Sequence, residues 1–257
     1  MIRNFLLRIV PAALVAWGML AAPGLAQTGA QNEPNTRYKV NLPPSADLAY
    51  AIKAKQSGLP VEGDGLVHWT ASSNKFEIKS ETRAALFGKI LEAKSEGSVD
   101  GYGLAPGSFT EKRIRRDAVT TSFDRASKTI KFGSSSQSYP LKGGEQDRTS
   151  ALWQLISVAR AAPAKFRPGS EWRFVVAGHS DAEPWTFKVL AQERLRTPAG
   201  EFNAVHVSRA APSGSKDQKL DIWLAPSLEW YPLRVRFSDA DGDFIDQTLR
   251  EVTKKSS

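Results

Sequence analysis

Hydrophobic and polar residues alternate with a period of two along most of this chain. Between residues 48 and 55, Leu48, Tyr50 and Ile52 alternate with smaller or charged residues, and the same alternation returns at 76–83. Because successive side chains of a strand point to opposite faces, this period predicts strands with one buried face.

The alternation continues in further segments, with turn signals between them about every 8–12 residues. We expect additional strands at 67–69, 88–96, 109–116, 119–124, 128–132, 171–178, 184–194, 202–210, 217–224, 232–238 and 244–251. Many short strands of this spacing are typical of an all-β sandwich or barrel.

One segment, 146–163, departs from the period of two. Its apolar residues recur at helical spacing, at Leu152, Leu155, Ile156 and Ala159. Asp147 or Thr149 can cap the start of this helix, and Pro163 closes it. We therefore predict a mainly β fold: a single antiparallel sheet curled into an open barrel or spiral, with helix 147–161 packed on it or inside it.

The final hairpin allows a prediction of strand register. A three-residue loop at 240–242 places Phe237 opposite Ile245 and Arg236 opposite Asp246. Apolar then meets apolar and charge meets opposite charge, and the glycine that ends the loop occupies the left-handed position. A two-residue loop would shift the register by one and mix the two faces of the sheet.

The N-terminus indicates export to the periplasm. Arg3 and Arg8 precede an apolar run, Ile9–Ala22, and small residues favour cleavage after Ala26. The run is too short to span a membrane, which needs about 20 residues. We expect a signal peptide at 1–26 and a product that does not span the membrane.

The remaining chain shows no linker that would divide it. We expect a flexible lead at 27–37, a single β-rich domain at 38–252 and a tail at 253–257. The absence of cysteine excludes disulfides, thiolate metal sites and a lipidated N-terminal cysteine. The formal net charge of +8 favours encounters with anionic envelope surfaces, and nucleic acid is not an expected partner in that compartment.

No residues form a recognisable catalytic or metal-binding pattern, and no cofactor is expected. The acid-rich stretch 239–246 begins like a calcium loop, but glycine stands at its fourth place and Arg250 at its twelfth. An Asp- and Gly-rich turn explains these residues equally well. The three histidines, His68, His179 and His206, are far apart in sequence, and no serine lies in a nucleophile elbow.

Two stretches remain as candidates for ligand contact. The basic run 112–116 is either a solvated strand or an edge strand, or else an anion-contact strip, and it would add to the charge of Arg234 and Arg236 only if the two strands were neighbours. In 223–237 the aromatic residues favour core packing. As the alternative, we hypothesise that four residues border a ligand groove: Trp223, Trp230, Arg234 and Arg236.

Three segments resemble a known family: "TPAGEFNAVHVSR", "LDIWLAPSLEWYPLRVRF" and "GDFIDQTLREV". They are similar to the bacterial family catalogued as domain-of-unknown-function 3108, and the resemblance extends over most of the chain beyond residue 26. It implies an exported, β-rich envelope protein, and it transfers no catalytic residue.

The expected function is therefore non-catalytic: binding of a lipid-like ligand, an envelope polymer or an envelope protein. One alternative is a carboxylate-based hydrolase of cell-wall glycan, for which the available acids are Glu193, Glu201, Asp217 and Asp221. Such an enzyme needs two acids about 5–10 Å apart in a cleft. Another alternative is a structural scaffold for envelope assembly, which would present an exposed sheet edge or a large apolar patch.

Overall fold

The structure, a computed structural model, describes residues 35–209 and 219–255. The expected signal peptide at 1–26 and most of the expected lead at 27–37 lie outside these residues. Asn35, within that lead, donates hydrogen bonds to the carbonyl oxygen of Gly143 at 2.7 Å and to Glu145 at 2.9 Å.

The strands of the described residues form one sheet, in the order β8-β7-β6-β5-β4-β3-β2-β1-β15-β14-β13-β12-β11-β10-β9. Their bounds are β1 Ala46–Gln56, β2 Leu59–Ala71, β3 Lys75–Ala84, β4 Gly88–Asp100, β5 Gly103–Arg113, β6 Val119–Asp124, β7 Thr129–Lys131, β8 Ser138–Pro140, β9 Gln146–Asp147, β10 Glu171–Ala177, β11 Ala182–Thr197, β12 Gly200–Arg209, β13 Lys219–Leu224, β14 Pro232–Ser238 and β15 Phe244–Lys254. Pairing is antiparallel except between β9 and β10, which are parallel. The first and last strands, β1 and β15, are neighbours in the middle of the sheet.

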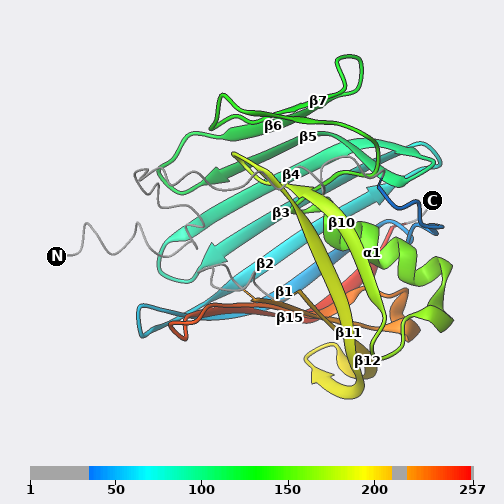
Figure 1. The fold of residues 1–257 in the computed structure, drawn as a ribbon. Coiled ribbons are helices and arrows are strands. Elements are labelled where there is room, and N and C mark those ends of the chain that lie inside the picture. The colour runs from blue at the N-terminus through cyan, green and yellow to red at the C-terminus, as the bar shows by residue number, and fades with distance from the viewer. Residues whose placement is uncertain (1–34, 210–218, 256–257) are drawn as a thin grey trace.

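The sheet curls strongly but does not close, as the sequence predicts. In Figure 1, β10 and β11 cross over the part of the sheet that contains β1–β4. Side chains link the two halves where they approach: the Thr121 hydroxyl donates to the carbonyl oxygen of Gly178 at 2.8 Å, and the Ser134 hydroxyl donates to that of His179 at 2.7 Å. The predicted fold class is therefore confirmed.

Helix α1, Ser150–Ala161, is buried on nearly all sides and packs against β5, β9 and β10. Asp147 caps it by accepting hydrogen bonds from the backbone N–H groups of Thr149 and Ser150, both at 2.8 Å, whereas the Thr149 side chain makes no cap bond. Within the core, the Trp153 ring stacks on Trp69 at 4.4 Å between centroids.

The register predicted for the last hairpin is confirmed. Phe237 pairs with Ile245 and Arg236 pairs with Asp246. Gly242 has a φ of 82°, in the left-handed region that the three-residue loop requires.

The strand expected at 109–116 ends earlier than predicted, within the basic run 112–116. β5 ends at Arg113, and the chain then turns through Arg115, which has a φ of 57°. β5 is an interior strand of the sheet between β4 and β6, and it is not a neighbour of β14. The run therefore does not form an edge strand and does not add to the charge of the β14 arginines, whereas its solvated character is confirmed by the exposed Lys112, Arg115 and Arg116. At the other end of the chain, β15 continues to Lys254, past residue 252 where the domain was expected to end.

Candidate functional site

A cavity of about 270 Å³ lies between the inner faces of the two halves of the curled sheet, next to the start of α1. It is lined by Gly65, Leu66, Val67, Ser80, Glu81, Thr82, Ile90, Leu91, Ala93, Phe109, Glu111, Arg113, Arg148, Thr149, Leu152, Trp185, Phe187, Leu220, Ile222, Val235, Phe237, Ile245 and Gln247. Residues from β2–β5 form one wall, and residues from β11 and β13–β15 form the other. The volume is slightly below the usual range for ligand pockets, about 300–1,000 Å³.

The wall formed by β11 and β13–β15 is almost wholly apolar, because alternation directs one side-chain set of each strand inward. Phe187, Ile222 and Val235 are buried and face the cavity, whereas the residues between them in the strands face outward. Leu152 of α1 adds a further apolar side chain. This wall suits a hydrocarbon ligand.

The β5 wall carries a carboxylate that is engaged by an arginine and a histidine. Glu111 accepts from the Arg113 guanidinium at 2.5 Å and lies 3.2 Å from Nε2 of His179. Burial acts to raise the pKa of Glu111, but the hydrogen bond from His179 and the charge of Arg113 outweigh it and lower the pKa to about 2. Glu111 is therefore ionised and compensated within the wall.

Arg148 also lines the cavity, in the link between β9 and α1. Its guanidinium lies against Gly178, so closely that a Cβ atom on Gly178 would be 2.8 Å from Nη2. Among the described residues, no carboxylate forms an ion pair with Arg148. The site therefore combines an apolar wall with one guanidinium that has no carboxylate partner among the described residues.

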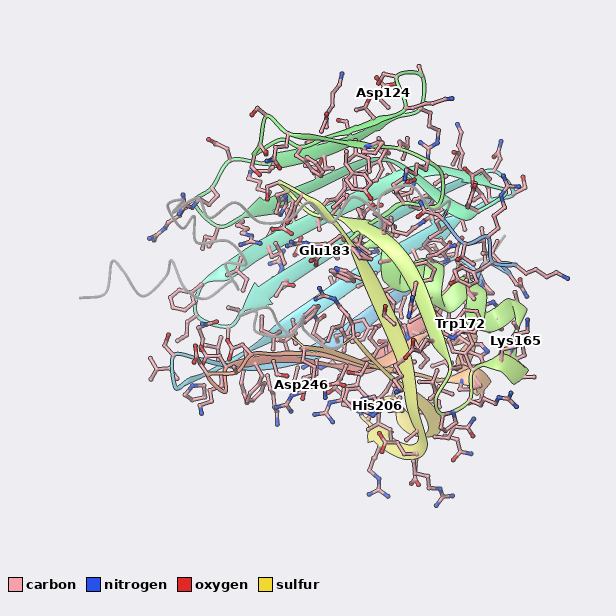
Figure 2. All side chains as sticks on the ribbon, in the orientation of Figure 1. Asp124, Lys165, Trp172, Glu183, His206 and Asp246 are labelled. Atoms are coloured by element: carbon pink, nitrogen blue, oxygen red, sulfur yellow. The ribbon has the colours of Figure 1, made fainter. Side chains whose placement is uncertain are left out.

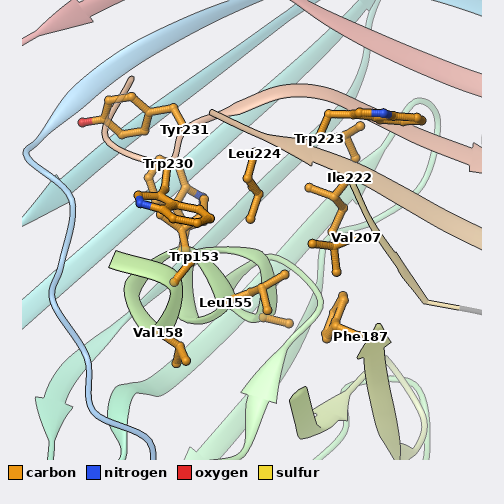
Figure 3. Packing of buried hydrophobic residues seen from close by; sticks show 14 of the residues in the cluster. Trp153, Leu155, Val158, Phe187, Val207, Ile222, Trp223, Leu224, Trp230 and Tyr231 are labelled. Carbon is orange, nitrogen blue, oxygen red and sulfur yellow. The ribbon is translucent and has the colours of Figure 1, made fainter. Parts of the chain in front are cut away.

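Of the four residues hypothesised to border a groove, Trp223, Arg234 and Arg236 lie together on β13 and β14, Trp230 lies apart from them, and none of the four lines the cavity. Trp223 and Arg234 are neighbours on β13 and β14, with the guanidinium 4.9 Å from the Trp223 ring centroid. Arg236 lies two residues further along β14. Figure 3 shows the Trp223 ring directed away from Ile222, which faces the core.

Trp230 lies elsewhere, in the turn that precedes β14. It packs edge-on against Phe166 at 5.4 Å between ring centroids, and it is 7% exposed. It belongs to the same core cluster as Trp153 and Tyr231 (Figure 3).

The outer face around Trp223 is a saturated polar network. His206 stacks on the Trp223 ring at 4.3 Å and lies 2.9 Å from Asp221, while the Trp223 indole N–H donates to Glu193. Burial acts to raise the pKa of Asp221, but hydrogen bonds from His206 and Lys219 outweigh it and lower the pKa to about 2.

Arg234 and Arg236 both donate hydrogen bonds to Asp246 on this face. Asp246 and His206 are labelled in Figure 2. The Nε atom of Arg234 donates at 2.7 Å, and the hydrogen bonds to Asp246 raise the pKa of the Arg234 guanidinium. Each of these groups already has a partner in the folded chain.

Of the acids considered for hydrolysis, Glu193 and Asp221 share His206, with Glu193 at 3.8 Å from Nδ1. Glu201 is exposed and pairs with Arg194 and Arg196, and Asp217 lies outside the described residues. Each histidine has a carboxylate partner in a different part of the fold: His68 with Asp47, His179 with Glu111 and His206 with Asp221.

Sequence reasoning missed Arg148 and Glu111. Glu111 could have been placed on the inner face, because it is two residues after Phe109 in an alternating strand. Arg148 gave no such signal, because it lies in a link between elements.

The family model described as a protein of unknown function, DUF3108, matches residues 47–250, which include every residue that lines the cavity. The chain belongs to the DUF3108 family. No curated protein matches it.

Among solved structures, a β-barrel-like DUF1849 protein from Brucella abortus aligns with a TM-score of 0.57 at 12% identity, covering 84% of this chain and 100% of that one. This likeness shows the fold alone. A protein from Bacteroides fragilis described as exported, with a YmcC-like fold, aligns at 10% identity with a TM-score of 0.32, covering 85% and 100% of the two chains. That score is too low to support an argument.

In the part of this DUF3108 protein that the structure describes, no helix is long and apolar enough to cross a membrane. No group of three or more His, Asp or Glu side chains in the same residues is arranged to hold a metal ion.

Proposed function

We propose that this DUF3108 protein is an exported cell-envelope protein that binds a lipid-like ligand in the cavity, without catalysing a reaction. The observation that carries the proposal is the apolar cavity between the two halves of the sheet. The export of the protein is supported by the charge and hydrophobicity pattern of the N-terminus, together with membership of the family.

An apolar hollow in a protein is costly unless something fills it. Protein interiors are close-packed, and each cubic ångström of cavity left by a truncated side chain costs about 24 cal/mol. A hydrocarbon chain gains about 0.8 kcal/mol for each methylene that it buries. A ligand with an acyl chain therefore matches the wall of Phe187, Ile222 and Val235 better than a polar glycan does.

The hydrolase alternative has less support in the geometry. Glu193 and Asp221 lie beside a histidine on the outer face, where both accept hydrogen bonds from neighbouring side chains. A glycosidase needs two acids facing each other across a space for the sugar. An envelope polymer or partner protein would have to dock on the outer surface, where the polar groups around Trp223 already have partners within the chain.

The test uses the exported full chain, stripped of lipid, and an acyl probe whose fluorescence rises in an apolar site. Leu152→Trp adds bulk at the cavity wall. Leu190→Trp adds the same bulk at a position that is 42% exposed on β11, and it serves as the matched control.

We expect Leu152→Trp to weaken probe binding at least about tenfold, because the added ring occupies the hydrocarbon space. Leu190→Trp should bind the probe as the unaltered protein does. Equal binding by all three proteins would show that the probe does not use the cavity and would contradict the proposal. Mass spectrometry of material copurified from native envelopes then identifies the lipid.

A further inference from the structure

Arg148 is positioned to contact a ligand that enters the cavity. It lines the cavity together with Thr149 and Leu152, so that a cation lies next to an apolar surface. The guanidinium lies close against Gly178, where a Cβ atom would be 2.8 Å from Nη2.

The carboxylates nearest to Arg148 in sequence are committed to other donors. Asp147 accepts from the Ser95 hydroxyl at 2.5 Å and from the first backbone N–H groups of α1. Glu145 accepts from Asn35 and from the backbone N–H groups of Lys142 and Gly143. Neither carboxylate neutralises Arg148.

The other acids of the cavity wall are also compensated. Glu111 is bound by Arg113 and His179, and Glu81 is bound by Arg83 and Lys89. Within the described residues, Arg148 is thus the charged group of the wall that lacks an oppositely charged partner. The wall carries an uncompensated positive charge beside a hydrocarbon surface.

A partly buried charge without a partner is unfavourable, so a wall of this kind favours a ligand that brings an anion. The guanidinium is planar and holds a carboxylate or a phosphate by two parallel hydrogen bonds. These bonds are stronger next to an apolar surface than in bulk water.

We propose that the ligand is a single-chain amphiphile with a carboxylate or phosphate head group, and that Arg148 binds this head group. The hydrocarbon chain lies along the wall that contains Phe187, Ile222 and Val235. This inference rests on the proposed function. It specifies in addition that the ligand is negatively charged and that its charge is held at the end of the cavity next to the start of α1.

The experiment compares three ligands of equal chain length, dodecanoate, dodecyl phosphate and dodecanol, by calorimetric titration of the delipidated full chain. The variants are Arg148→Met, which removes the cation, and Arg148→Lys, which keeps the charge but loses the planar donor pair. Lys188→Met removes one positive charge from an exposed position of β11 and controls for net charge.

In the unaltered protein we expect at least one of the two anionic ligands to bind about tenfold or more tightly than dodecanol, the size expected for a charge-assisted hydrogen-bonded pair. Arg148→Met should abolish this preference and leave dodecanol binding unchanged, which also shows that the variant is folded. Arg148→Lys should retain part of the preference, and Lys188→Met should retain all of it.

Three outcomes separate the possible failures. Equal affinity of all three ligands in the unaltered protein would overturn the role of Arg148 and leave the lipid-binding function standing. Binding of none of them would overturn the proposed function itself. If inorganic phosphate displaced bound dodecanoate at the same concentration as dodecyl phosphate does, the site would bind free anions. That result would overturn the proposal that the ligand is an amphiphile.

Discussion

The arginines on the outer face of β14 differ from the arginine in the cavity in what surrounds them. Arg234 and Arg236 share the carboxylate of Asp246, which is 8% exposed, and Arg234 also lies over the ring of Trp223. Arg148 lies beside an apolar cavity and has no carboxylate partner among the described residues. The outer pair is satisfied by the fold, whereas the inner arginine is left available.

This contrast distinguishes charged side chains that are paired within the fold from a charged side chain that is left to bind a ligand. A buried ion pair contributes little net stability, but removing one partner is costly because the other charge stays behind. A cation without a partner contributes no such interaction to the fold, so its presence in the wall is better explained by what the cavity binds. The following predictions test whether the inner and outer charges differ in this way.

The largest expected effect concerns Glu111, the inner charge that does have partners. Its pKa is about 2 in the folded chain, whereas the ordinary pKa of a glutamate is 4.5. The folded pKa is depressed, so the stabilisation is complete above pH 4.5 and is lost as the pH falls toward 2. At about 1.36 kcal/mol per pKa unit, the stabilisation amounts to about 3 kcal/mol.

Glu111→Gln should therefore lower the free energy of unfolding by up to about 3 kcal/mol at neutral pH, and by almost nothing at pH 2. Urea denaturation at several pH values measures this difference. The part that comes from Asp221, whose pKa is also about 2, should persist in the variant. If the difference in the free energy of unfolding between variant and parent stayed constant from pH 7 to pH 2, the lowered pKa of Glu111 would be refuted.

A smaller effect is expected from Asp246→Ala on the outer face. Loss of this carboxylate leaves two guanidinium groups without their partner, but both are about one-third exposed and remain partly hydrated. We expect a loss of about 2 kcal/mol in the free energy of unfolding by urea denaturation. Asp241→Ala, in the exposed hairpin loop, is the control and should change stability by less than about 0.5 kcal/mol.

Asp246→Ala should also leave acyl-probe affinity unchanged once the folded fraction is taken into account. A specific loss of affinity would mean that the outer arginines contact the ligand, as the sequence-based hypothesis of a groove at Trp223, Trp230, Arg234 and Arg236 has it. That result would break the comparison between the two faces.

The smallest effect on stability is expected at Arg148. Arg148→Met removes no ion pair within the described residues and adds an apolar side chain to the cavity wall. The free energy of unfolding should stay within about 0.5 kcal/mol of the parent or rise. A loss of 2 kcal/mol or more by urea denaturation would show that Arg148 holds the fold together and would remove the contrast with Arg234.

Local patterns were sufficient for most of the elements. The period of two located most of the strands, but it did not predict β8 or β9 and gave β2 only from residue 67 although it begins at Leu59. The charge and hydrophobic matching of Arg236 with Asp246 and Phe237 with Ile245 identified the last hairpin correctly. The same reasoning failed at 112–116, because the basic run contains the end of a strand and the turn after it, and charge alone does not mark where a strand ends.

The alternation also placed Trp223 in an expected strand, 217–224. It did not reveal that His206 and Arg234 would pack against its ring, since these residues are brought together by pairing of β12, β13 and β14. Sequence spacing carries no information on which strands become neighbours across the sheet.

The sequence by itself determined the mainly β class, the position of the one helix in the described residues and the inward or outward direction of most strand residues, because these follow from local periodicity. Only the tertiary structure decided that the sheet curls around a cavity and that Arg148 reaches this cavity without a carboxylate partner. The cavity wall draws on residues from β2 to β15, and no local pattern encodes the distances between segments so far apart in the chain.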